Sequence, residues 1–289
     1  MADDARRQAE ELDFWDGPVT ALPHPIGDGW FLVDDGDKQY AVHMADDRPD
    51  YAVFRYNEIA VSQAAHDAGL SPALLHHEPG AMVFEHLPDA VQITSGAHMG
   101  RLVGLLGQSH LDLAGHLEVP GPMLWVFQQN RRYARIIMQH GGALAPALTR
   151  LMVQNDELED AVGPIRPVFC HNNLSRAAFL NDGQRIWLVD WSHGGWNDDL
   201  YDLAGLAIHL ELDRVAEDEM LRHYLSVTDT GLEQAGRRRF AAWKCAALLW
   251  SSMWCAIGDM FSDGDVNFAR QGQGKLDRLA QAMAEFREH

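Results

Sequence analysis

Positively charged residues are scarce in this sequence of 289 residues. Against 42 aspartates and glutamates stand 23 lysines and arginines, which gives a formal net charge of −19. Nucleic acids and anionic lipid surfaces are bound through basic surface, so we expect neither as a partner. The excess of negative charge has two possible interpretations. It promotes solubility, or it reflects an acidic cleft that attracts a cationic small molecule.

Cysteine is also rare. The three cysteines are widely spaced and form no Cys-x-x-Cys pair: Cys170, Cys245 and Cys255. The number is odd, and the spacings do not match those of zinc sites. The sequence therefore disfavours a disulfide framework or a zinc centre.

Long apolar runs are missing as well. A membrane-spanning helix needs about 18 or more consecutive apolar residues. The longest candidate, 240–260, is interrupted by Lys244 and Asp259. Residues 1–4 are acidic and lack the apolar segment of a signal peptide. We expect no membrane span and a cytoplasmic location.

Short apolar runs and turn residues dominate the first third of the chain. The tetrapeptide 34–37 and the pair Pro79-Gly80 are turn signals, each lying between two apolar runs. Four strands are predicted, at 30–33, 39–44, 73–75 and 81–84. Helical periodicity predicts helices at 3–15 and 51–68, the second ended by Gly69. Residues 1–86 are therefore predicted to form a small sheet carrying a helix.

The remainder, residues 87–289, reads as a mostly helical domain. Helices are predicted at 96–116, 124–140, 145–160, 199–212, 215–225, 232–262 and 267–287. Short strands are predicted at 167–170, 179–180 and 186–190. The fold class is α+β, with a domain boundary between residues 86 and 87.

The segment 169–204 carries a motif. His171 is followed by Asn173 and Ala178, a strand then ends in Asp190-Trp191, and Tyr201-Asp202-Leu203-Ala204 opens a helix. This resembles the catalytic region of choline/ethanolamine kinases and aminoglycoside phosphotransferases, whose pattern is His-x-Asp-x-x-x-x-Asn, then Asp-Trp or Asp-Phe, then Tyr-Asp-Leu-Ala. Weaker similarity extends from about residue 25 to 280. The resemblance implies a two-lobed protein-kinase-like fold, with a small N-terminal lobe of antiparallel sheet plus helix and a larger helical C-terminal lobe.

The resemblance also implies roles for individual positions. The catalytic base of the family falls at Asn173, where an amide cannot accept a proton, and the second magnesium ligand falls at Ala178, where a methyl group has no oxygen to offer. Asp190 is retained, either as a metal ligand or as a cap of local backbone N–H groups. We expect His171 and Asp202 to shape the loop, Asp202 as a helix N-cap.

The small lobe departs from the family pattern too. The resemblance places nucleotide-contacting residues at Gly27, Gly29, His43, Glu58 and Glu85. His43 replaces the lysine or arginine that normally contacts phosphate, and Glu58 is the retained helix glutamate that would align it. Asp28, inside the phosphate-covering loop, would repel phosphate.

Three tryptophans share one face of the predicted helix 232–262: Trp243, Trp250 and Trp254. With Trp191, and with Trp196, Tyr201, Asp198 and Asp199 as further candidates, they are proposed to hold the cationic head of a substrate through cation–π attraction. The alternative is ordinary core packing between helices.

Three functions remain open. The favoured one is a choline/ethanolamine kinase-like protein that is catalytically impaired (pseudokinase-like) and binds a small molecule or a protein partner in the interlobe cleft, with weakened use of ATP and Mg²⁺. The alternative is an active ATP-dependent phosphotransferase acting on choline, ethanolamine or a related amino alcohol. The third is an interaction protein whose cleft is filled.

Overall fold

The computed structural model describes residues 2–174, 178–228, 236–262 and 266–288, and the chain divides into two compact units. The first unit comprises the described residues of Met1–Pro122 and Asn173–Gly194, and the second those of Met123–Asn172 and Gly195–His289. The chain therefore leaves the first unit after Pro122 and returns to it at Asn173. A domain boundary between residues 86 and 87 stays a prediction.

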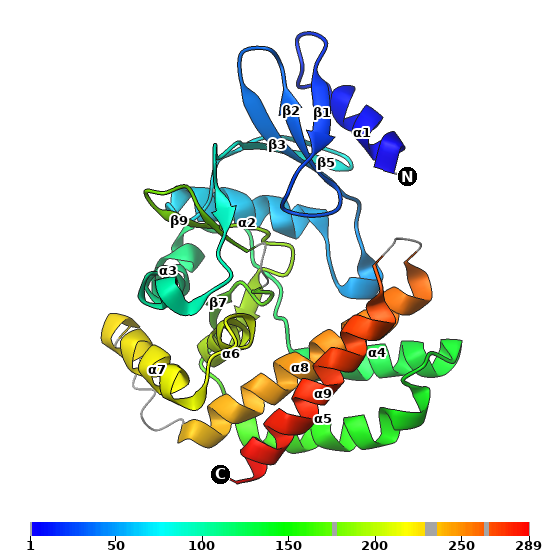
Figure 1. Cartoon of the computed structure of the whole chain (residues 1–289), viewed down its shortest axis with the longest axis vertical. Helices are drawn as coiled ribbons and strands as arrows, with labels where there is room; N and C mark the ends of the chain where they lie inside the picture. The colour runs from blue at the N-terminus through cyan, green and yellow to red at the C-terminus, as the bar shows by residue number, and fades with distance from the viewer. Residues whose placement is uncertain (1, 175–177, 229–235, 263–265, 289) are drawn as a thin grey trace. The chain divides into compact units, whose positions relative to one another are not determined.

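The first unit is built on a five-stranded antiparallel sheet with the strand order β1-β2-β3-β5-β4 (Figure 1). The strands are β1 (Thr20–Pro23), β2 (Trp30–Asp34), β3 (Gln39–Met44), β4 (Leu74–Glu78) and β5 (Ala81–Glu85). The β2–β3 and β4–β5 hairpins were predicted. The strand β1 was missed because it is short and ends in a proline, which suits the edge position that it occupies.

The helix predicted at 3–15 is shorter than expected, since α1 spans Ala2–Glu10. Beyond it the Nε1–H of Trp15 donates to the Ala9 carbonyl at 2.8 Å, which turns the chain back along the helix. Leu12, Phe14 and Trp15 then pack against the same core cluster as the sheet residues Phe31 and Val83. Burial of these aromatic rings thus ends the helix early.

The helix predicted at 51–68 begins later, since α2 spans Arg55–Asp67. Ala52 adopts a left-handed conformation (φ 58°). The carboxylate of Asp47 accepts the backbone N–H of Arg55 at 2.7 Å and so satisfies a donor at the start of the helix. Ile59 of α2 packs on the sheet face that carries Trp30 and Phe84.

The rest of the first unit contains the helix α3 and a second, three-stranded sheet in the order β6-β8-β9. Their bounds are α3 (Met99–Asp112), β6 (Val91–Gln92), β8 (Phe179–Asn181) and β9 (Ile186–Leu188). The Leu188 N–H donates to the Leu70 carbonyl at 2.9 Å, and the Ser71 hydroxyl donates to the Leu188 carbonyl. These bonds tie the returning segment to the chain that follows α2.

The second unit is mostly helical. It contains α4 (Val126–His140), α5 (Leu148–Val162), the strand pair β7 (Val168–Cys170) and β10 (Gly195–Asn197), α6 (Asp199–His209), α7 (Arg214–Thr228), α8 (Gly236–Phe261) and α9 (Phe268–Arg287). The long helix α8 packs against α4, α5, α6 and α9, and runs beside α9 (Figure 1). Sheet and helices together confirm the predicted α+β class.

Within the described part of the chain one helix, α8, is long and apolar enough to cross a membrane by length and composition, although 72% of its most apolar window is buried inside the protein.

Candidate functional site

A pocket of about 520 Å³ lies within the first unit, a size typical of small-molecule sites. One wall is the sheet face formed by Trp30, Leu32, Ala41 and Phe84, and Leu180 and Val189 of the returning segment also line the pocket. The polar lining residues are His24, Glu58, Ser62, Ser71, Glu85, His86, Asp89, Gln92 and Asp190. The pocket is therefore an apolar slot with a polar border that includes the carboxylates of Glu58, Glu85, Asp89 and Asp190.

Asp190 and Trp191 follow strand β9 and both line this pocket. Asp190 has a left-handed backbone (φ 66°), a conformation that costs energy for a residue other than glycine and is found at functional sites. Its Oδ1 accepts the Ser192 hydroxyl at 2.8 Å. Trp191 is buried, and its Nε1–H donates to the Ser71 hydroxyl at 2.8 Å. Asp190 thus lines the pocket with its carboxylate bonded to Ser192, and the next residue, Trp191, is anchored to Ser71.

The two altered motif positions, Asn173 and Ala178, belong to the same unit as Asp190. Ala178 is 0% exposed, and its carbonyl accepts the Val189 N–H at 2.9 Å. Position 178 is therefore fixed beside the strand end that carries Asp190. A methyl group there adds no metal-binding oxygen, and the backbone carbonyl already accepts a hydrogen bond.

Glu58 is buried (1% exposed) and is shared by two bases. Its Oε1 lies 3.5 Å from Nδ1 of His43, and its Oε2 forms an ion pair with Arg55. The glutamate therefore pairs with Arg55, a residue of its own helix and not the strand residue that the family resemblance implies. We overlooked Arg55, although its spacing of three residues before Glu58 on a helix is a recognisable ion-pair signal.

The loop that contains Gly27 and Gly29 is held next to His43. The Met44 N–H donates to the Gly29 carbonyl at 2.7 Å, and Gly29 has φ 78°. A Cβ at Gly29 would lie 2.9 Å from the Met44 carbonyl oxygen. The side chain of Gln92, which lines the pocket, donates to the Pro25 carbonyl at 3.3 Å and ties down the start of this loop.

Two histidines that the sequence did not point out, His24 and His86, line the pocket beside Glu85. Their rings meet edge to face, with centroids 6.0 Å apart. Burial, helped by the neighbouring His86, lowers the pKa of His24 to about 4. Burial also lowers the pKa of His86, against the opposing effect of Asp89. Both rings are therefore neutral at pH 7.

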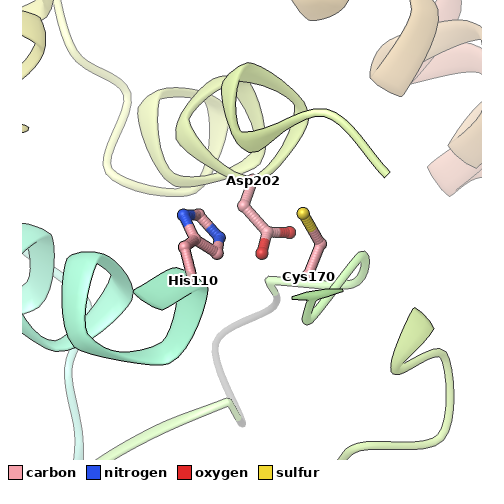
Figure 2. A group of neighbouring side chains, drawn as sticks. All are labelled: His110, Cys170 and Asp202. Atoms are coloured by element: carbon pink, nitrogen blue, oxygen red, sulfur yellow. The ribbon is translucent and has the colours of Figure 1, made fainter. Parts of the chain in front are cut away.

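In the second unit, Asp202 braces the start of the motif loop. Its Oδ2 accepts the backbone N–H of His171 at 2.7 Å, and its Oδ1 accepts that of Asn172 at 2.8 Å. The N-cap of α6 is Asp198, which accepts the Leu200 N–H, so the predicted capping role of Asp202 was wrong, although its bracing role is observed. Cys170 lies beside the Asp202 carboxylate (Figure 2), and burial, then the charge of Asp202, raises the pKa of its thiol well above the usual value.

The tryptophans proposed as a substrate wall differ in environment. Trp243 is 0% exposed and touches the rings of Phe127, Trp125 and Tyr201. Trp250 is also buried, whereas Trp254 is half-buried and packs edge to face on Phe268. All three belong to the second unit and Trp191 belongs to the first. The burial of Trp243 favours core packing for that ring.

The acids proposed to accompany these rings are engaged within the second unit. Asp198 is buried and forms an ion pair with Arg239, and Asp199 accepts the Tyr224 hydroxyl at 3.2 Å. Burial, together with the neighbouring Asp199 carboxylate, raises the pKa of Asp198 to about 6, against the lowering effect of Arg239. These carboxylates thus have internal partners.

The chain is similar to protein LicA of Haemophilus influenzae, with 25% identity over 169 residues, which are 55% of this chain and 61% of LicA. The match thus spans less than two thirds of that relative. No protein-family model matches the chain.

Solved structures agree in fold over almost the whole chain. A choline/ethanolamine kinase family protein from Mesorhizobium loti has a TM-score of 0.75 at 21% identity, covering 97% of this chain and 94% of its own. Choline kinase LicA from Streptococcus pneumoniae has a TM-score of 0.78 at 19% identity, covering 98% of both chains. A structure of LicA in complex with AMP has a TM-score of 0.77 at 20% identity, covering 99% of both. These likenesses confirm the kinase-like fold.

Proposed function

We propose that this chain is a choline/ethanolamine kinase-like protein that binds an adenine nucleotide in the pocket of its first unit and transfers phosphate poorly or not at all. The fold likeness to a structure of LicA in complex with AMP supports nucleotide as the ligand class. The pocket volume and its apolar walls suit a planar base.

The observation that carries the loss of transfer is the pair Asn173 and Ala178. Phosphoryl transfer depends on a group that orients the attacking hydroxyl and on metal ions that neutralise the phosphates. An amide at 173 supplies no general base, a loss that costs about 10²- to 10⁴-fold in rate. At the strand end the carboxylate of Asp190 is retained, whereas Ala178 contributes no side-chain oxygen. This donor set leaves Mg²⁺ one protein carboxylate at the strand end, so phosphates and water would have to complete its octahedral coordination, and we expect weakened metal binding.

A second candidate, an active amino-alcohol phosphotransferase, has one specific observation in its favour. Glu58 and Asp190 are both retained, and both line the pocket. Positioning alone contributes much of the rate of phosphoryl transfer. A filled, purely structural site is disfavoured by the volume of the pocket.

The test has two parts. Calorimetric titration of the full chain with ATP, with and without Mg²⁺, should give a saturable heat that depends little on the metal. Incubation with Mg-ATP and a panel of choline, ethanolamine and related amino alcohols should give little phosphorylated product. Failure to bind ATP would contradict nucleotide binding. Rapid product formation that is abolished by Asp190→Ala would instead establish the active enzyme.

A further inference from the structure

The described residues that line the first-unit pocket include neither a lysine nor an arginine. They do include the carboxylates of Glu58, Glu85, Asp89 and Asp190. A nucleotide brings several negative charges of its own on its phosphates. The pocket carboxylates and the phosphates would repel each other, and the repulsion is strong where burial reduces screening by water and salt. Positive charge from a residue just behind the wall would therefore favour nucleotide binding in this pocket.

The strand position that would normally supply the charge is occupied by packing. The His43 imidazole lies flat on the Trp30 indole, with centroids 4.3 Å apart and 4° between the planes. Gly29 lies close to the imidazole, since a Cβ there would lie 3.8 Å from Cδ2 of His43. The His43 imidazole therefore packs between the loop and the Glu58 carboxylate.

Arg55 provides a permanent charge next to this position. It is the first residue of α2, its side chain is only 14% exposed, and it is paired with Glu58, which lines the pocket. Its Nε is buried without a hydrogen-bond partner among the described residues. The bond from its backbone N–H to Asp47 fixes where the side chain starts. A guanidinium can pair with a carboxylate along one edge and still offer donors to phosphate.

We propose that Arg55 supplies the phosphate-binding charge that strand position 43 lacks, with Glu58 holding the guanidinium in place. In this arrangement the charge comes from helix α2 and not from the sheet, and Glu58 is its partner. The inference rests on the proposed nucleotide binding and adds a residue that discriminates nucleotides from nucleosides. It explains why a buried glutamate is kept although position 43 is a histidine.

The experiment compares ATP with adenosine, which has no phosphate, by calorimetric titration of the full chain. The wild type should bind ATP more tightly than adenosine. Arg55→Gln should weaken ATP binding by about 10- to 100-fold, the loss expected for hydrogen bonds to a charged group, and leave adenosine binding unchanged. Arg7→Gln, an equal change of charge on the exposed face of α1, is the matched control and should leave both affinities unchanged.

Two further variants address folding and mechanism. Arg55→Gln leaves Glu58 buried without its cation, so Arg55→Gln with Glu58→Gln removes both charges and should show the same selective loss of ATP affinity. Arg55→Gln with His43→Lys returns the cation to the strand, within reach of Glu58, and should restore most of the ATP affinity.

The possible results distinguish failure of the proposed function from failure of the role of Arg55. A wild type that binds neither ligand overturns the proposed function and this inference together. A wild type that binds ATP no more tightly than adenosine, or a folded Arg55→Gln variant with unchanged ATP affinity, overturns the role of Arg55 alone. An equal loss of both affinities also overturns it, because a structural defect in the pocket would not separate the two ligands.

Discussion

The ring of His43 is stacked on that of Trp30, and the two residues face each other across the β2–β3 pair. The same imidazole reaches Glu58 with its Nδ1, 3.5 Å from the carboxylate. Position 43 is thus filled by a flat ring that joins the hairpin to α2. The sequence alone indicated only that position 43 lacks the lysine or arginine of the family pattern. The structure shows that the histidine there packs between Trp30 and Glu58.

Gly29→Ala should destabilise the first unit by about 1–3 kcal/mol, because φ 78° is strained for alanine and its Cβ would meet the Met44 carbonyl at 2.9 Å. Urea denaturation measures the loss. Gly27→Ala is the matched control, since nothing lies within 4 Å of the position that its new methyl group would take, and it should change stability by less than about 0.5 kcal/mol. Equal effects of the two substitutions would contradict the packing described for Gly29.

Asp202→Asn should destabilise the second unit by about 1–3 kcal/mol. The buried carboxylate accepts two backbone N–H groups, one on each oxygen, and an amide would turn a donor toward one of them. Asp213→Asn is the control: this exposed residue accepts the Ala216 N–H at the start of α7, where asparagine serves equally well. Thermal unfolding, followed by circular dichroism, measures both variants. Equal melting temperatures for Asp202→Asn and Asp213→Asn would contradict the bracing role.

Trp243→Ala should cost about 3–5 kcal/mol, as expected for a large ring removed from a core. Trp254→Ala, on the same helix but half-buried, should cost less. If Trp243 instead formed a cation–π wall, choline would quench wild-type tryptophan fluorescence and Trp243→Phe would reduce that response. We expect no such difference, and its appearance would restore the substrate-wall interpretation.

Single elements show which parts of the structure could be predicted from the sequence. Hairpins around Gly36 and Gly80 were predictable because turn residues separate apolar runs, and the resemblance of segment 169–204 to the kinase family implied the kinase-like fold. The early end of α1 could not be predicted, because it depends on the hydrogen bond from the Trp15 side chain back to the Ala9 carbonyl. Nor could the pocket border, where His24 and His86 meet although they are far apart in sequence. Long-range contacts of this kind leave no periodic signal in a single chain.

Acidification should weaken the first unit through His24. Its pKa is about 4 in the folded protein, against the ordinary histidine value of 6.5, so between these values the unfolded chain binds a proton that the folded chain does not. The free energy of unfolding therefore falls as the pH drops from 6.5 towards 4. His24→Gln should lose less stability over that window than the wild type, whereas His116→Gln, at an exposed site, should follow the wild type. Denaturant midpoints at several pH values measure this; parallel curves for wild type and His24→Gln would contradict it.

Restoring the two motif residues should raise phosphoryl transfer. Asn173→Asp supplies a group that orients the acceptor hydroxyl, and Ala178→Asn supplies an oxygen beside Asp190 for a metal ion. We expect the double variant to exceed the wild type by about 10²-fold or more with Mg-ATP and an amino alcohol, in a coupled assay for ADP release. Adding Asp190→Ala should remove the gain, which shows that the new activity uses this site.

The size of the gain also separates two causes of low activity. A large gain means that the loop substitutions alone limit transfer and that Arg55 supplies enough positive charge for the phosphates. No gain, in a variant that still binds ATP, contradicts this prediction and attributes the low activity to the first unit's loop and strand, where Asp28 and His43 stand. Adding His43→Lys to the double variant then decides the matter, because only a missing strand charge would be repaired by it.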